Sequence, residues 1–379
     1  MEKYVNIVCI VILSTIFAFI GYNIINTNCT GDETIGIILP AHYPERWIQD
    51  GNILKDSFEE QGYQVILTYC NDNTDKQIES IRSMIDSNVD LLIIAPVDSN
   101  SLSEVLNQVK KEKIPVISYD RLILNTDAVS YYVSFDNYII GALQAQYIVD
   151  NLNLDSDTNA KYSMEIFSGD INDSNSLLFY NGAMDILRPY LTSGKITIPS
   201  TQMNFQDTYI SMWDTDTASN RMDNILASYY SKSNMLDIAL CANDSIALGV
   251  TNSLKSYYNN SYSTIITGQD GDVDNLNNII DGYQSMTILK NVANEVSITL
   301  NLAISILNDE YPDAGLISAS GWYFECVYDN DSFNNGSEIV PSYLITPQIV
   351  TINNYKELLI NSGNFSLDAN GKIIDSDSD

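Results

Sequence analysis

Charged, amide and indole side chains in this sequence repeatedly follow short apolar runs that predict buried β-strands. Arg121 follows the run at 114–119, for example, and Lys290 follows the run at 285–289. Ligands of open α/β sheets bind beyond the carboxyl ends of the strands, so we expect these side chains to meet in one crevice. The candidate ligand-contacting residues are Arg46, Trp47, Arg121, Asp173, Asn175, Trp213, Asn243, Asp270 and Lys290.

These side-chain types suit a polyhydroxylated ligand. Arginine and lysine donate hydrogen bonds, carboxylates accept them, and asparagine does both. The forked guanidinium of Arg121 suits paired acceptors such as vicinal hydroxyls or a carboxylate, and an indole face offers an apolar platform to a pyranose ring. Each residue taken alone has an ordinary alternative, such as a solvated charge for Arg46, a loop cap for Asp173, or core packing for Trp213. Their shared position at strand ends favours a ligand site.

The elements that would position these residues alternate regularly. Four strand–helix units occupy residues 34–120, and the same alternation of apolar runs and amphipathic stretches returns over 161–290. Successive βα units predict parallel, doubly wound sheets. The 379 residues are enough for two domains with proper cores. We therefore predict an α/β fold with two doubly wound, Rossmann-like lobes.

Several short motifs coincide with the candidate site. They are ERW at 45–47, YDRLI at 119–123, SFDN at 134–137, D-x-N at 173–175, the loop Trp213, ND at 243–244, GQD at 268–270, MTILK at 286–290 and LITP at 344–347. Together they resemble the D-xylose-binding branch of the type I periplasmic sugar-binding proteins, over nearly the whole chain from residue 34 to about 363. One departure is Asn291, which stands where a proline commonly follows the lysine.

This resemblance implies the type I periplasmic binding protein fold, in which a three-crossover hinge joins the lobes. It also implies that Arg46, Arg121, Asp173, Asn175, Trp213, Asn243, Asp270 and Lys290 contact a bound pentose. We expect one lobe to comprise 34–133 plus 291–320 and the other 134–290 plus 321–363, with an acidic tail at 364–379. The crossovers are expected near Val133, Lys290 and Gly321, and LITP resembles the final crossover of the family.

The N-terminal residues 5–25 form an apolar stretch long enough to span a bilayer. No small-residue cleavage site of the A-x-A kind follows it, and Asn-Thr-Asn before Cys29 is a poor lipoprotein signal. We expect an uncleaved N-terminal membrane helix, with residues 1–33 as the anchor, and a cleaved signal segment is the alternative. In either case the rest of the chain is expected to work outside the cytoplasm.

The acidic charge balance argues against nucleic acid as a partner. The sequence has 18 basic and 49 acidic residues and a net charge of −31, whereas phosphate binding needs basic patches. The five cysteines form no CxxC pair, and we expect neither a metal nor a cofactor. A related bilobed repressor would need a basic helix-turn-helix before the first lobe, where this chain has the apolar stretch.

The expected function is therefore capture of a monosaccharide, most of all D-xylose, and its delivery to an ABC-type sugar permease. A membrane-tethered sensor that reports the sugar to a histidine kinase is the main alternative. An enzyme acting on glycosides is a remote one, with Asp173 and Asp270 as its possible carboxylate pair. No nucleophile elbow, phosphate loop or dinucleotide fingerprint is present, and the single histidine, His42, is expected to be an ordinary loop residue.

Overall fold

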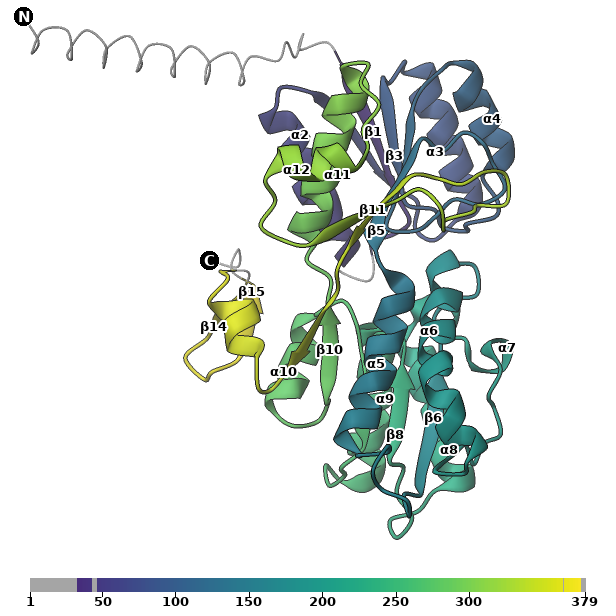
Figure 1. Cartoon of the computed structure of the whole chain (residues 1–379), viewed down its shortest axis with the longest axis vertical. Coiled ribbons are helices and arrows are strands. Elements are labelled where there is room, and N and C mark those ends of the chain that lie inside the picture. Colours follow the sequence, from purple (N-terminus) through teal and green to yellow (C-terminus); the bar gives the residue numbers. More distant parts are fainter. Residues whose placement is uncertain (1–32, 43–45, 364, 376–379) are drawn as a thin grey trace, which may run out of the picture.

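Two α/β lobes stacked along the long axis of the molecule form the computed structural model, which describes residues 33–42, 46–363 and 365–375 (Figure 1). The first lobe is built on a seven-stranded sheet in the order β11-β12-β5-β4-β3-β1-β2. Its strands are β1 (Thr34–Leu39), β2 (Gln64–Tyr69), β3 (Leu91–Ile94), β4 (Val116–Tyr119), β5 (Tyr131–Phe135), β11 (Cys326–Asp329) and β12 (Ser342–Ile345). Its helices are α2 (Arg46–Glu60), α3 (Thr74–Asp86), α4 (Ser103–Lys111), α11 (Val292–Leu307) and α12 (Ala314–Ser320).

The first sheet is doubly wound, as the alternation of strands and helices predicts. Its strands pair in parallel from β2 to β12, and only β11 runs antiparallel to its neighbour. Helices α2, α11 and α12 cover one face, and α3 and α4 cover the other (Figure 1). The four residues of β3 are all buried because both faces of the sheet are covered.

The second lobe is built on a four-stranded parallel sheet in the order β7-β6-β8-β9, with the antiparallel pair β10–β13 beside it. Its strands are β6 (Tyr162–Phe167), β7 (Ile196–Thr197), β8 (Ile238–Cys241), β9 (Ile265–Ile266), β10 (Met286–Leu289) and β13 (Gln348–Thr351). Its helices are α5 (Asn137–Asn151), α6 (Ser174–Thr192), α7 (Phe205–Thr208), a 3-10 turn (Ser211–Trp213), α8 (Thr215–Tyr229), α9 (Asp244–Tyr258), α10 (Val273–Ile280) and a π-helical turn (Lys356–Ile360).

Two glycines let α5 and α6 pack closely, and this contact places the beginning of α6 at the junction of the lobes. A Cβ on Gly141 would lie 1.9 Å from the carbonyl oxygen of Phe179, and a Cβ on Gly182 would lie 2.0 Å from that of Tyr138. Any larger side chain would therefore separate the helices.

The pairing of β11 and β12 corrects the expected division of the chain. We expected residues 321–363 in the second lobe and a crossover near Gly321, but β12 pairs in parallel with β5 of the first sheet. All four residues of β12 are buried, and they cover an apolar edge of β5 that would otherwise be exposed. The third crossover lies between β12 and β13, within the LITP motif. The first crossover lies at Asp136, close to the expected position near Val133, because the whole of β5 belongs to the first sheet.

Residues 365–375 of the expected acidic tail at 364–379 are structured. Strands β14 (Phe365–Leu367) and β15 (Ile373–Asp375) form a hairpin around an Asn-Gly turn, in which Gly371 has a φ of +79°. The side chain of Asn277 on α10 holds this hairpin through both backbone groups of Ile373, at 2.9 and 3.0 Å. The buried side chain of Ile373 adds an apolar contact.

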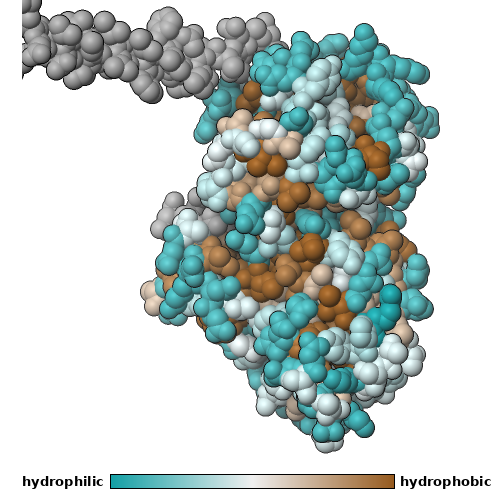
Figure 2. Space-filling view, viewed as in Figure 1, coloured by the Kyte–Doolittle hydropathy of each residue, from teal (hydrophilic) through white to brown (hydrophobic). Residues whose placement is uncertain are grey.

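Most of the visible surface is hydrophilic, and the more apolar side chains gather near the junction of the two lobes (Figure 2). Among the described residues, no helix is both long enough and apolar enough to cross a membrane. The expected membrane helix at 5–25 lies outside the described residues, so it stays a prediction.

Candidate functional site

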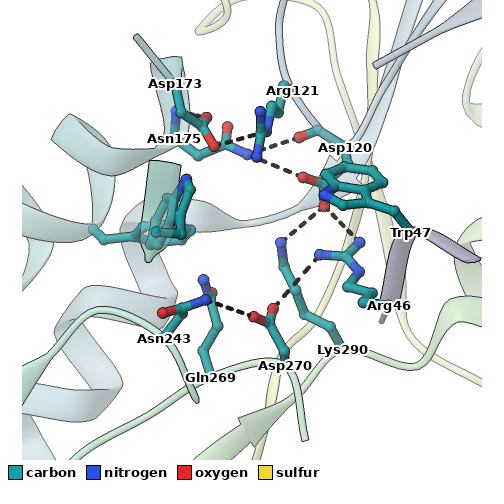
Figure 3. Close-up of a pocket in the computed structure, with 12 residues that line it drawn as sticks. Arg46, Trp47, Asp120, Arg121, Asp173, Asn175, Asn243, Gln269, Asp270 and Lys290 are labelled. Carbon is teal, nitrogen blue, oxygen red and sulfur yellow. Dashed lines mark hydrogen bonds and ion pairs between the residues drawn. The ribbon is translucent and has the colours of Figure 1, made fainter. Parts of the chain in front are cut away.

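A cavity between the two lobes collects the polar residues that follow the strands. The space between its walls is about 380 Å³ when the open solvent at its mouth is included. Twelve side chains line the cavity (Figure 3): Arg46, Trp47, Asp120, Arg121, Asp173, Asn175, Phe179, Trp213, Asn243, Gln269, Asp270 and Lys290. All nine residues expected from the sequence are among them, whereas His42 is not. That these nine contact a ligand remains a prediction.

Three lining residues were not predicted from the sequence: Asp120, Phe179 and Gln269. Two of them are direct neighbours of predicted residues, since Asp120 precedes Arg121 and Gln269 precedes Asp270. Phe179 lies one helical turn after Asn175 on α6, so it shares the helix face that enters the cavity. Adjacency and helical spacing were therefore the signals that could have identified them.

Asp120 connects residues from several helices and strands around the cavity. Its carboxylate accepts hydrogen bonds from Arg46 at 2.7 Å and from Lys290 at 2.8 Å. Its backbone carbonyl accepts hydrogen bonds from Ser134 at 2.7 Å and Asn175 at 2.9 Å. Burial alone would raise the pKa of Asp120, but the charges of Arg46 and Lys290 outweigh it and hold that pKa well below its usual range. Asp120 is therefore an ionised acceptor.

Four carboxyl groups surround the guanidinium of Arg46. Besides Asp120, they are Glu295 at 3.0 Å, Asp50 at 3.3 Å and Asp270 at 3.5 Å. Burial would lower the pKa of Arg46, but these carboxyl groups raise it, so the arginine stays charged. Burial raises the pKa of Glu295 well above its usual value and that of Asp50 to about 6, although Arg46 opposes both shifts. Helix α11 thus supplies Glu295, which pairs with the guanidinium of Arg46 from α2.

Arg121 reaches across the junction from the first lobe. Its Nε lies 2.8 Å from a carboxylate oxygen of Asp173, and its Nη1 donates to the carbonyl of Pro96 at 3.2 Å. Asp173 also caps α6 by accepting a hydrogen bond from the backbone N–H of Asn175. The guanidinium stands 5.1 Å from the centre of the Trp47 ring, close enough for a cation–π interaction.

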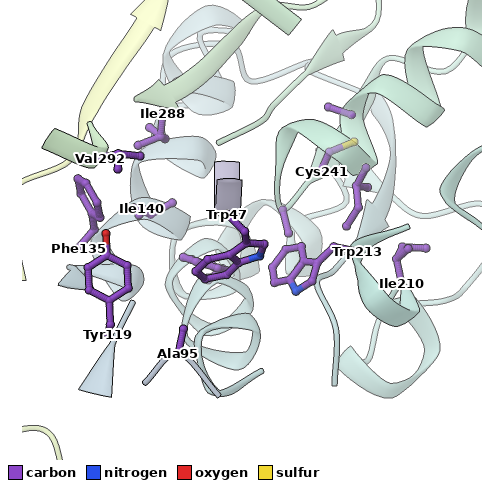
Figure 4. Close-up of a cluster of buried hydrophobic side chains, with 14 of the residues drawn as sticks. Trp47, Ala95, Tyr119, Phe135, Ile140, Ile210, Trp213, Cys241, Ile288 and Val292 are labelled. Atoms are coloured by element: carbon purple, nitrogen blue, oxygen red, sulfur yellow. The ribbon is translucent and has the colours of Figure 1, made fainter. Parts of the chain in front are cut away.

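Each lobe supplies one indole to the cavity, Trp47 from α2 and Trp213 from the 3-10 turn (Figure 4). Trp213 packs edge-on against Phe179, with ring centres 6.2 Å apart. A Cβ on Gly169 would lie 2.0 Å from the Trp213 ring, so a larger residue there would displace the indole. The Nε1 donor of Trp213 is buried and has no hydrogen-bond partner among the described residues. An indole with an unused donor suits a ligand with hydroxyl groups.

Residues after β8 and β9 complete the second-lobe wall. Asn243 caps α9 through its Oδ1, and its Nδ2 donates to Asp270 at 3.2 Å. The Oε1 acceptor of Gln269 is buried and unpartnered among the described residues. With three basic and three acidic side chains, the lining has balanced charge, which favours a neutral ligand that both donates and accepts hydrogen bonds.

Asp50 gives the stability of the fold a testable dependence on pH. Its pKa is raised from 3.8 to about 6, so the folded state binds this proton more tightly than the unfolded state does. The stability it contributes is therefore complete below the unfolded pKa and is lost as the pH rises towards about 6. In urea unfolding from pH 4 to 8, Asp50→Asn should lose less stability across this window than the wild type. Asp56→Asn, at an exposed position on the same helix, should retain the wild-type slope, and an equal slope in Asp50→Asn would contradict the assignment.

Known proteins are similar to this chain over most of its length. A multiple sugar-binding periplasmic protein of Azospirillum brasilense is 36% identical over 88% of this chain and 90% of its own length. The D-xylose-binding periplasmic protein of Escherichia coli is 31% identical over 90% of this chain and 97% of its own length. A solute-binding protein of an ABC transporter from Clostridium phytofermentans, solved with bound β-D-glucose, superposes with a TM-score of 0.82 at 42% identity, over 88% of this chain and 98% of that one.

The profile of the periplasmic binding protein domain matches residues 35–310, which confirms the resemblance inferred from the motifs. These relatives are binding proteins, so the glycoside-acting enzyme is excluded. The chain therefore belongs to the periplasmic binding protein family, with the type I fold and a non-enzymatic, sugar-binding role.

Proposed function

We propose that this protein captures an aldopyranose, D-xylose above all, in the cavity between its lobes and delivers it to an ABC-type sugar permease. The observation that carries the proposal is the balanced lining, in which three basic and three acidic side chains stand beside two indoles. Such a wall offers donors and acceptors to a ring of hydroxyl groups, and the indole faces suit its C–H surfaces. Relatives that bind D-xylose or multiple sugars support this substrate class.

The proposed contacts are those nine residues predicted from the sequence together with Asp120 and Gln269. Asp120, Asp173 and Asp270 would accept hydrogen bonds from sugar hydroxyls. Arg46, Arg121 and Lys290 would donate them, while their ion pairs keep the donors in place before the sugar arrives. Because these charges are already ordered, binding costs less side-chain entropy than it would in a mobile site.

D-Glucose is the second candidate, because a structure 42% identical to this chain was solved with β-D-glucose. D-Xylose and D-glucose in their pyranose forms differ by one hydroxymethyl group on the ring. A pocket that accommodates the larger sugar has to provide space and a hydrogen-bond partner for that group. Discrimination between these two sugars is therefore a question of fit around one ring carbon.

We also propose that residues 5–25 anchor the chain in the membrane, so that each copy serves partners in its own membrane. The anchor raises the local concentration at a permease or, as the alternative, at a sensor histidine kinase. Lobe closure on a sugar would present a changed surface to either partner. N-terminal sequencing of the mature protein tests the premise: a chain that begins after residue 22, or at a lipid-modified Cys29, would remove the tether.

Calorimetric titration of the chain from residue 34 onward tests the substrate. We expect D-xylose to bind with a measurable heat and one site per chain, and D-glucose to bind as the next-best sugar. L-Arabinose and D-ribose serve as pentose controls of altered hydroxyl configuration. Binding of D-glucose alone would transfer the proposal to the hexose, and no heat with any monosaccharide would reject it.

Arg121→Ala tests the wall that joins the lobes. This change leaves the buried carboxylate of Asp173 without its cation, and an unpaired buried group costs about 1–3 kcal/mol. The dissociation constant for the sugar should therefore rise on the order of ten- to hundredfold. Arg188→Ala removes an exposed arginine from α6 and should leave the constant unchanged. An unchanged constant in Arg121→Ala would show that this residue does not support binding.

A further inference from the structure

We propose that Asp244 is a positioning residue for the sugar: its carboxylate fixes the loop 268–272, and through that loop it places Asp270 and Gln269 in the cavity. Asp244 itself is fully buried and does not line the cavity. The inference rests on the proposed sugar-binding function and extends it from the cavity wall to the residue behind it.

Hydrogen bonds from Asp244 hold the main chain on both sides of Asp270. Its Oδ2 accepts from the backbone N–H of Gly271 at 2.9 Å and of Asp272 at 3.0 Å. Its own backbone N–H donates to the carbonyl of Gln269 at 2.8 Å. Three contacts from one residue therefore enclose the residue that carries the cavity carboxylate.

The carboxylate of Asp244 is in turn held from the side of β10. Thr287 donates its hydroxyl to it at 2.9 Å, and Gln284 donates its side-chain amide at 3.1 Å. The neighbouring Gly268 has no room for a side chain, since a Cβ there would lie 2.1 Å from Oδ1 of Asp244. Four donors and a close backbone leave the carboxylate a single position.

The conformation of Asp270 explains why such support is needed. Its φ is +106°, a value that residues other than glycine rarely adopt, so the surroundings must hold it there. In this conformation its carboxylate lies 3.5 Å from Arg46 and 3.2 Å from Nδ2 of Asn243. If the loop relaxed, these distances and the direction of the Gln269 amide would change together.

Capping of α9 does not account for Asp244. The cap of that helix is Asn243, whose Oδ1 accepts from the backbone N–H of Ile246 at 3.0 Å. The carboxylate of Asp244 is directed instead to a separate loop and to β10. The two adjacent residues therefore have different roles: Asn243 contacts the side chain of Asp270, and Asp244 contacts the backbone on either side of it.

The experiment is a titration of wild type, Asp244→Asn and Asp274→Asn with D-xylose and D-glucose. Asp244→Asn keeps the shape of the side chain but replaces one acceptor oxygen with a donor. We expect its dissociation constant to rise about tenfold or more. Asp274→Asn makes the same substitution at an exposed position on α10 and should bind as the wild type does. Equal affinity in wild type and a folded Asp244→Asn would overturn the proposal.

A double-mutant cycle with Asp270→Asn separates positioning from a general structural role. If Asp244 acts through Asp270, Asp244→Asn should weaken binding less than about twofold in the Asp270→Asn background. If the two substitutions instead multiplied the dissociation constant by their separate factors, the residues would act independently and the proposal would be overturned.

Monodeoxy sugars give a second readout. Binding to Asp244→Asn and to Asp270→Asn should become insensitive to loss of the same sugar hydroxyl, and insensitivity to different hydroxyls would contradict the inference.

Thr287→Val keeps the proposal testable if Asp244→Asn does not fold. This variant retains the carboxylate and removes one donor to it, and we expect a loss of affinity of about threefold with the same hydroxyl preference as Asp270→Asn. If Asp244→Asn does not fold, unchanged affinity and selectivity in Thr287→Val would refute the role. A wild type that binds neither sugar would instead reject the proposed function, so the two failures are distinguishable.

Discussion

Asp120 follows β4 with a φ of +57°, and its carboxylate lies between the cations of Arg46 and Lys290 at 2.7 and 2.8 Å. These cations come from α2 and from the crossover after β10, which are far apart in the sequence. The backbone carbonyl of Asp120 adds β5 and α6 through Ser134 and Asn175. One turn thus connects both lobes. Because loss of one partner from a buried ion pair typically costs about 3–5 kcal/mol, the lobes and the site depend on the same contacts.

The same contacts explain how a cavity full of charges suits an uncharged ligand. Every cation in the wall is paired with a carboxylate, as Arg121 is with Asp173 and Lys290 is with Asp120. Pairing removes the net field that would favour an anion, yet it leaves lone pairs and N–H groups for hydroxyls. Burial ensures that a sugar lacking one hydroxyl would leave a polar group unsatisfied, which is the physical basis of selectivity. Preorganisation by Asp244 and Glu295 extends this arrangement one layer behind the wall.

The position of the cavity residues relative to the strands could be predicted from the sequence, whereas the pairing of strands far apart in the sequence could not. The apolar runs before Arg121 and Lys290 predict strands, and parallel strands bring their carboxyl ends to one edge, so most of the wall residues could be predicted from position. Trp213 lies in a loop before α8, and the family motifs supported its prediction. Gln269 carries no such signal beyond its place before Asp270. The sheet that β12 joins depends on which strand edge is free, which is a property of the folded lobes. The division of the chain expected from the resemblance therefore placed this strand in the wrong lobe. The docking of the hairpin at 365–375 could not be predicted, because its contact with Asn277 is a tertiary one.

A crystal structure of the chain from residue 34 onward with saturating D-xylose tests the central claim most directly. The account predicts a pyranose in the cavity, with its ring between Trp47 and Trp213, and with the carboxylate of Asp120 accepting a hydrogen bond from a sugar hydroxyl while Arg46 and Lys290 remain its partners. A sugar bound elsewhere, or one bound in the cavity without any contact to Asp120, Asp173 or Asp270, would contradict it.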